Sequence, residues 1–230
     1  MRGGEGRGEG MRSVMGALSV ALGVMTPATA TADPSSNVPP AAIDRLMFSQ
    51  REAERVMGAG LPNVQRQSAT FALDTDRPDC GSVVLASVSS YDRSPYMAAH
   101  SQALWDHPGW FTLVDQSVAV FSTDQEARGF TRSEADRWRT CENQTINVSE
   151  QAVDGSVLQA TVDIRDITQV DNVLAVSYGR NDSAYAFCQH VLLGERNVAI
   201  DIRTCSTVSK SDGERAFELM KIVGPRVWEA

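Results

Sequence analysis

The sequence predicts an α+β domain in which a central, mainly antiparallel sheet is flanked by helices and held by two disulfides. Three observations support this prediction. Five β-rich runs follow one another between residues 145 and 205, separated by turn residues. Three other segments carry apolar residues at helical spacing. The chain also has 4 cysteines, an even number, behind an N-terminal segment that is typical of an export signal.

The five runs read TINVSE, VLQATVDIRDIT, NVLAVSYGR, SAYAFCQHVLLG and NVAIDIRTC. An earlier run over 112–121 alternates well, and its strongly apolar side carries Val114, Gln116, Val118 and Val120. Sheet runs flanked by a few helices are typical of the α+β class. Residues 81–91 are rich in small residues, and both a strand and a helix remain open there.

Helices are predicted over 41–57, 122–141 and 209–227. The first ends at Gly58 and Gly60, and the second has Ser122 or Thr123 as its N-cap. The side chains expected to be buried on the second and third helices are Ala127, Phe130, Ala135, Trp138, Ala216, Leu219, Met220 and Val223.

The N-terminus indicates export. Three arginines precede the apolar run Val14–Met25, and two small-x-small patterns follow it, so a signal peptide is predicted. The apolar run is too short to span a bilayer, which needs about 20 residues. We expect a signal peptide over 1–32, cleaved after Ala32 or alternatively after Ala30, with translation starting at Met1 or Met11. An uncleaved anchor is the competing interpretation.

The predicted organisation is then a disordered lead-in over 33–40, followed by a single domain over 41–230 that begins with a helix. We expect the mature chain to have no membrane span and to be secreted or held in the cell envelope. The formal net charge of -8 disfavours nucleic acid as a partner.

The four cysteines, Cys80, Cys141, Cys188 and Cys205, are predicted to form two disulfides. Structural zinc sites bring their ligands closer together in sequence than these cysteines are, so no metal and no cofactor is predicted. If the last two β-rich runs form a hairpin in which paired residue numbers sum to 393, Cys188 lies opposite Cys205. The same register places Val191 opposite Ile202, on the other face of the hairpin. Cys80–Cys141 then follows by elimination.

No zinc-protease, nucleophile-elbow or phosphate-loop motif is present in the sequence. Asp106-His107-Pro108 invites a hydrolase interpretation, but a turn anchored by its neighbouring aromatic residues explains it better. We therefore expect the protein not to be an enzyme.

A group of polar and aromatic side chains is the candidate ligand site. If the strands pair as proposed, some of the side chains of Tyr178, Arg180, Tyr185, Gln189 and Arg203 are expected to crowd one face of the sheet, and Trp110 and Gln116 complete the candidate set. Such a face, if concave, suits a small anionic or sugar-like ligand. An ordinary hydrated sheet face is the alternative.

The chain resembles the PknH-like extracellular sensor domain family, which occurs in a mycobacterial serine/threonine kinase and in stand-alone mycobacterial secreted proteins and lipoproteins. The resemblance runs from Asp79 to Trp228, and its most specific residues are Cys188, Gln189, Leu192, Asn197, Val198, Asp201 and Cys205. It implies an antiparallel sheet flanked by helices, two disulfides, no catalytic activity, and a cleft for an unidentified ligand. The expected function is an exported, non-enzymatic envelope protein that binds an unidentified small ligand or envelope component in a cleft on the sheet. A structural or protein-interaction module of the envelope is the alternative.

Overall fold

Nine β-strands and a few short helices make up the computed structural model, which describes residues 37–68, 73–86, 91, 93–106, 112–151, 157–181, 187–207 and 214–230. The strands are β1 (Asn63–Gln67), β2 (Asp74–Thr75), β3 (Tyr96–Trp105), β4 (Thr112–Phe121), β5 (Thr145–Gln151), β6 (Val157–Val170), β7 (Val173–Arg180), β8 (Phe187–Glu195) and β9 (Val198–Ser206). The helices are the 3-10 helix η1 (Pro40–Leu46) and the α-helices α1 (Gln50–Met57), α2 (Gly81–Val84), α3 (Asp124–Thr140), α4 (Arg215–Val223) and α5 (Arg226–Glu229).

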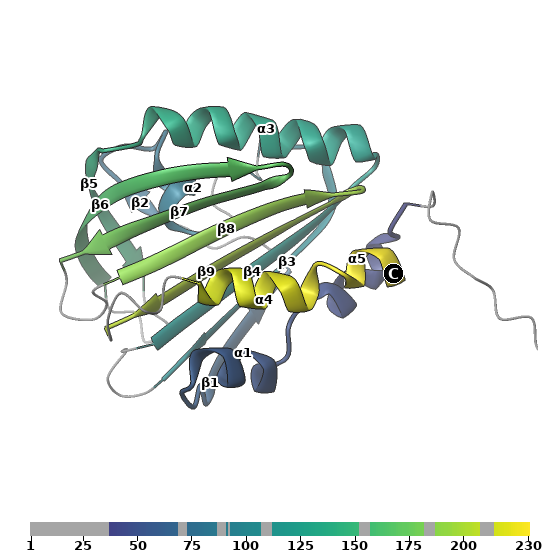
Figure 1. Ribbon diagram of the computed structural model, residues 1–230, viewed down its shortest axis with the longest axis horizontal. Coiled ribbons are helices and arrows are strands. Elements are labelled where there is room, and N and C mark those ends of the chain that lie inside the picture. The colour runs from purple at the N-terminus through teal and green to yellow at the C-terminus, as the bar shows by residue number, and fades with distance from the viewer. Residues whose placement is uncertain are drawn as a thin grey trace, which may run out of the picture. The chain divides into compact units, whose positions relative to one another are not determined.

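The strands form one sheet in the order β1-β3-β4-β9-β8-β7-β6-β5-β2, and each neighbouring pair is antiparallel. The predicted fold class is therefore confirmed. Helices lie on both faces, with α3 on one side and α4 on the other (Figure 1). None of the described helices combines the length and the apolar character needed to cross a membrane.

The alternation of side chains along the strands divides the core into two layers. The layer under α3 contains all four cysteines, Tyr178 and Trp138. The layer under α4, η1 and α1 contains Val191 and Ile202. The hairpin register predicted from the cysteines thus agrees with the pairing of β8 and β9, in which Cys188 faces Cys205.

Two disulfides form as predicted. We call Cys80–Cys141 the helix disulfide, because it ties the end of α3 to the start of α2, and Cys188–Cys205 the hairpin disulfide. The α3 helix begins at Thr123, whose hydroxyl accepts a hydrogen bond from the Glu126 N–H (3.2 Å), and it buries the predicted apolar stripe.

The N-terminal part differs from the prediction of one helix over 41–57. The chain instead breaks between η1 and α1, because Ser49 starts a new helix through a capping box with Glu52. The end of the predicted lead-in also needs correction. Val38 is buried, and its N–H and C=O both bond to the side chain of Asn197 (2.8 and 3.0 Å), so the ordered domain includes residues 37–40.

The C-terminal helix predicted over 209–227 is also divided, into α4 and α5, at Gly224-Pro225. Its predicted inner face is confirmed, since Ala216, Leu219, Met220 and Val223 are buried. The segment left open over 81–91 begins as the short helix α2, and β1, β2 and β3 were not predicted.

Candidate functional site

The sequence-predicted ligand residues do not come together at one place. Gln116 and Gln189 lie on the α4 side of the sheet, with Val114 and Val191, whereas Tyr178 and Arg203 lie on the α3 side. All four are buried. Trp110 and Tyr185 lie outside the described residues.

On the α3 side, these buried polar residues hold the chain around α2. The carbonyl of Val84 accepts hydrogen bonds from the Tyr178 hydroxyl (2.7 Å) and from Nη1 of Arg203 (2.8 Å). Nδ1 of His190 donates to the neighbouring carbonyl of Val83 (2.8 Å). A helix as short as α2 leaves its last carbonyls without helical partners, so the sheet supplies donors for them.

Two buried charge contacts accompany these hydrogen bonds. Nε of Arg203 donates to Oδ2 of Asp115 (2.5 Å), and both side chains are almost fully enclosed. Nε2 of His190 contacts the carboxylate of Asp201, and the His190 ring packs against Trp138 with centroids 4.6 Å apart. Buried charges are tolerated when they are paired in this way.

Near Asp201, the side chain of Glu134 of α3 is also buried. Burial is the main cause that raises its pKa above 4.5, and the nearby Asp201 carboxylate adds to the rise, while Ser82, Arg137 and Trp138 oppose it. Burial likewise raises the pKa of Tyr91 well above 10, with a further contribution from Asp201.

On the α4 side, the two glutamines satisfy backbone groups at helix ends. Oε1 of Gln116 accepts from the Phe48 N–H (2.8 Å) and its Nε2 donates to the Leu46 carbonyl (3.0 Å), where the chain breaks between η1 and α1. Oε1 of Gln189 accepts from the Ala216 N–H (3.1 Å) in the first turn of α4. Gln189, Asn197 and Asp201, which carry the family resemblance, therefore all have a structural role.

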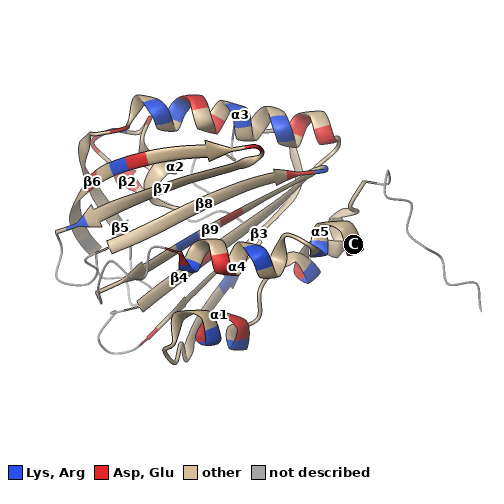
Figure 2. Cartoon of the chain, in the orientation of Figure 1, with Lys and Arg blue, Asp and Glu red and all other residues tan. Residues whose placement is uncertain are grey.

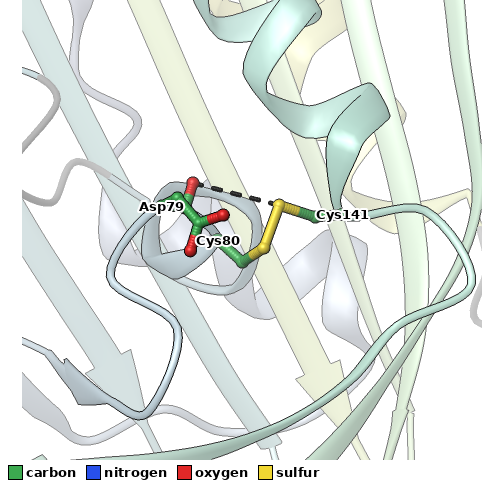
Figure 3. Close-up of side chains that lie close together, drawn as sticks. All are labelled: Asp79, Cys80 and Cys141. Atoms are coloured by element: carbon green, nitrogen blue, oxygen red, sulfur yellow. Dashed lines mark hydrogen bonds between the residues drawn. A yellow bond between two sulfur atoms is a disulfide. The ribbon is translucent and has the colours of Figure 1, made fainter.

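One group of potential metal ligands occurs among the described residues, namely Asp79, Cys80 and Cys141. Figure 3 shows that the two sulfur atoms of this group are bonded to each other in the helix disulfide, and the backbone carbonyl of Asp79 lies 3.9 Å from Sγ of Cys141. A disulfide has no thiolate to offer a metal, so this group does not fit a metal ion.

A groove between the N-terminal helices and the sheet offers a better candidate site. It has a volume of about 790 Å³ and lies between η1, the start of α1, the end of β1, the middle of β3, and α5. We call it the helical groove. Its charged lining residues are Asp44, Arg45, Glu52, Arg66, His100 and Arg226.

Two of the basic residues in the helical groove already have carboxylate partners. Nδ1 of His100 lies 2.7 Å from Oδ1 of Asp44, and Nη2 of Arg226 lies 2.5 Å from Oε1 of Glu52. Figure 2 shows acidic and basic residues close together on α1 and a basic residue on α5.

The two remaining arginines have no carboxylate partner in the part of the chain that the structure describes. Nε of Arg66 donates to Oε1 of Gln102 (3.2 Å), and Arg45 of η1 is exposed. Met47 and Phe48 also line the groove. Sequence reasoning missed this site because its residues come from both ends of the chain.

The groove can thus provide guanidinium groups to an incoming anion. Burial tends to raise the pKa of Glu52, but hydrogen bonds from Ser49 and the charge of Arg226 outweigh it and lower the pKa below 4.5. Glu52 therefore stays ionised and keeps Arg226 engaged, which leaves Arg45 and Arg66 as the available cations.

Comparison with known proteins supports the family resemblance. The model of the PknH-like extracellular domain matches residues 38–223. The serine/threonine-protein kinase PknH of Mycobacterium bovis is 24% identical over an alignment of 187 residues that covers 77% of this chain and 30% of the kinase. PknH of Mycobacterium tuberculosis is 23% identical over an alignment of 187 residues that covers 77% of this chain and 29% of the kinase. This chain thus spans about a third of the length of these curated relatives.

The fold is also shared with a solved structure. The crystal structure of the extracellular domain of PknH from Mycobacterium tuberculosis superposes with a TM-score of 0.69 at 20% identity, covering 83% of this chain and 99% of that domain. Because the family model matches most of the sequence, this chain belongs to the PknH-like extracellular domain family.

Proposed function

We propose that this chain is an exported, non-enzymatic protein of the cell envelope that binds a small anionic ligand in the helical groove. The apolar run Val14–Met25 with its small-x-small sites supports export. Membership of a family described as extracellular supports the same location.

The observation that carries the proposal is the pair of arginines without carboxylate partners at the rim of a concave groove. Arg45 and Arg66 come from separate elements, η1 and β1, and both line the groove. In a chain of net charge -8, a basic groove is a local exception that favours an anion. The guanidinium fork matches carboxylate and phosphate groups, which it binds through two parallel hydrogen bonds.

Isothermal titration of the secreted protein with inorganic phosphate and with citrate tests this function. Hydrogen bonds to a charged group contribute about 1.5–3 kcal/mol, so Arg45→Gln or Arg66→Gln should weaken binding by roughly 10- to 150-fold. Arg132→Gln is the matched control, because Arg132 is exposed on α3. Binding should also weaken as salt is added.

The absence of saturable binding of either anion would refute the anionic ligand and favour the structural or protein-interaction alternative. Equal effects of Arg66→Gln and Arg132→Gln would place any bound anion elsewhere. Mass spectrometry of the secreted protein tests export separately, since it should show a new N-terminus after Ala30 or Ala32.

A further inference from the structure

The outer face of the sheet at β2, β5 and β6 is polar in a regular way. Alternate residues of these strands are buried under α3, among them Ile146, Val148 and Val162. The residues between them point to the opposite face of the sheet. Polar residues line a hollow on that side, and we give the name polar strip to six of them: Asp76, Asn147, Ser149, Gln159, Thr161 and Asn181.

Hydrogen bonds made by the side chains, two of them with backbone N–H groups, hold one row of this strip across the strands. Both carboxylate oxygens of Asp76 accept from Asn147, one from its N–H (2.9 Å) and one from Nδ2 (2.7 Å). Oδ1 of Asn147 accepts from the Thr161 hydroxyl (3.1 Å), and Oδ1 of Asn181 accepts from the Thr161 N–H (3.0 Å). The side chains are thus held in place before any ligand arrives, which reduces the entropic cost of binding.

Two hollows follow each other along the strip. The larger, of about 600 Å³, is lined by β2, β5, β6 and Asn181. The smaller, of about 220 Å³, includes Thr145, Asp163 and Arg165. Thr145 and Ser149 of β5 line different hollows and are four residues apart, which is roughly 14 Å along a strand. This length suits an extended ligand better than a single small group.

The chemistry of the larger hollow limits what it can bind. Most of its described lining residues are Asp, Asn, Gln, Ser and Thr, joined by Val148 and Ala160, and none of them is a lysine, an arginine or an aromatic residue. Without cations it does not suit a phosphate-bearing ligand. Carboxylate, amide and hydroxyl groups together accept and donate hydrogen bonds, as neighbouring sugar hydroxyls require.

Two residues of the strip have hydrogen-bonding capacity to spare. The side chains of Ser149 and Gln159 face each other across β5 and β6 and make no hydrogen bond within the described part of the chain. We propose that the polar strip binds a neutral oligosaccharide chain that lies along β5 and β6, with Ser149 and Gln159 as direct contacts.

NMR titration of the full protein with maltotetraose and with chitotetraose tests this proposal. We expect saturable shifts of the amide signals of Asn147, Ser149 and Thr161 with at least one of the two sugars. Removing two neutral hydrogen bonds in Ser149→Ala/Gln159→Ala should weaken binding by about tenfold or more. The matched control is Gln125→Ala/Ser133→Ala on α3, which removes the same two groups from another exposed surface and should leave binding unchanged.

The test is independent of the helical groove, because Arg66→Gln should not change sugar binding. Unchanged melting temperatures would show that both double variants are folded. The proposal is overturned if neither tetrasaccharide shifts the strip signals, if the strip and control variants bind equally well, or if spermidine shifts the strip signals and the sugars do not. That last result would make the strip a site for cations.

Discussion

Replacing Arg203 with methionine should destabilise the protein strongly, because this side chain is part of the buried core and is not available to contact a ligand. The side chain of Arg203 is 2% exposed and that of its partner Asp115 is 3% exposed. The change Arg203→Met removes the guanidinium partner of the buried Asp115 carboxylate and one of two donors to the Val84 carbonyl. Breaking one side of a buried pair costs about 3–5 kcal/mol.

That loss is a large part of the roughly 5–15 kcal/mol by which domains are stable. It corresponds to a fall in melting temperature of roughly 6–20 °C for a chain of this size. Urea denaturation followed by circular dichroism measures the change, and Asp115→Leu/Arg203→Met should recover most of it, because the double variant removes both charges of the buried pair. A cost for Arg203→Met below about 1 kcal/mol, as at a hydrated surface residue, would refute the structural role.

Three further changes should alter stability in ways that urea denaturation can measure. Loss of the helix disulfide, which closes a loop of 61 residues, should cost about 4 kcal/mol, and loss of the hairpin disulfide, which closes a loop of 17 residues, should cost about 3 kcal/mol. The reverse order of the two costs would contradict the loop-entropy argument. Because the pKa of Glu134 is raised by burial, its favourable contribution is complete below about pH 4.5 and is lost as pH rises towards the raised value. As pH rises from 4 to 8, the Glu134→Gln variant should therefore become more stable relative to the wild type. A difference in unfolding free energy that stays the same over this range would be evidence against this. Gly194→Ala should cost about 1–3 kcal/mol, because the new Cβ would overlap the Thr131 hydroxyl. Adding Thr131→Ala should restore much of this loss, and the absence of any rescue would contradict the close contact between β8 and α3.

The sequence predicted those parts of the fold in which periodicity and covalent constraints agree. The alternation in the last two strands fixed the register, and the register placed Cys188 opposite Cys205. The apolar stripe of α3 was equally clear, because long amphipathic helices have a strong period. Short elements such as α2 and β2 carry no such period, and tertiary contacts decide their form.

The candidate ligand residues show where this reasoning stopped too early. The register that paired the cysteines also pairs Gln189 with Thr204 and His190 with Arg203, which puts Gln189 and Arg203 on opposite faces. Gln116 lies among valines on the apolar side of its strand, which indicates burial. The capping box of Ser49 and Glu52 could also have been found in the sequence.

The helical groove could not have been predicted in the same way. Arg45, Arg66, His100 and Arg226 are distant in sequence, and only the packing of η1, β1, β3 and α5 brings them to one place. No local pattern contains that information.

The most direct test of the proposed function is to map where citrate binds by NMR of the secreted protein. We predict that the amide signals of Arg45, Ser49, Arg66 and His100 shift together with one dissociation constant, and that signals around Tyr178 and Arg203 stay in place. Shifts that gather around Tyr178 and Arg203, with the groove signals unchanged, would contradict the proposal that the helical groove is the ligand site.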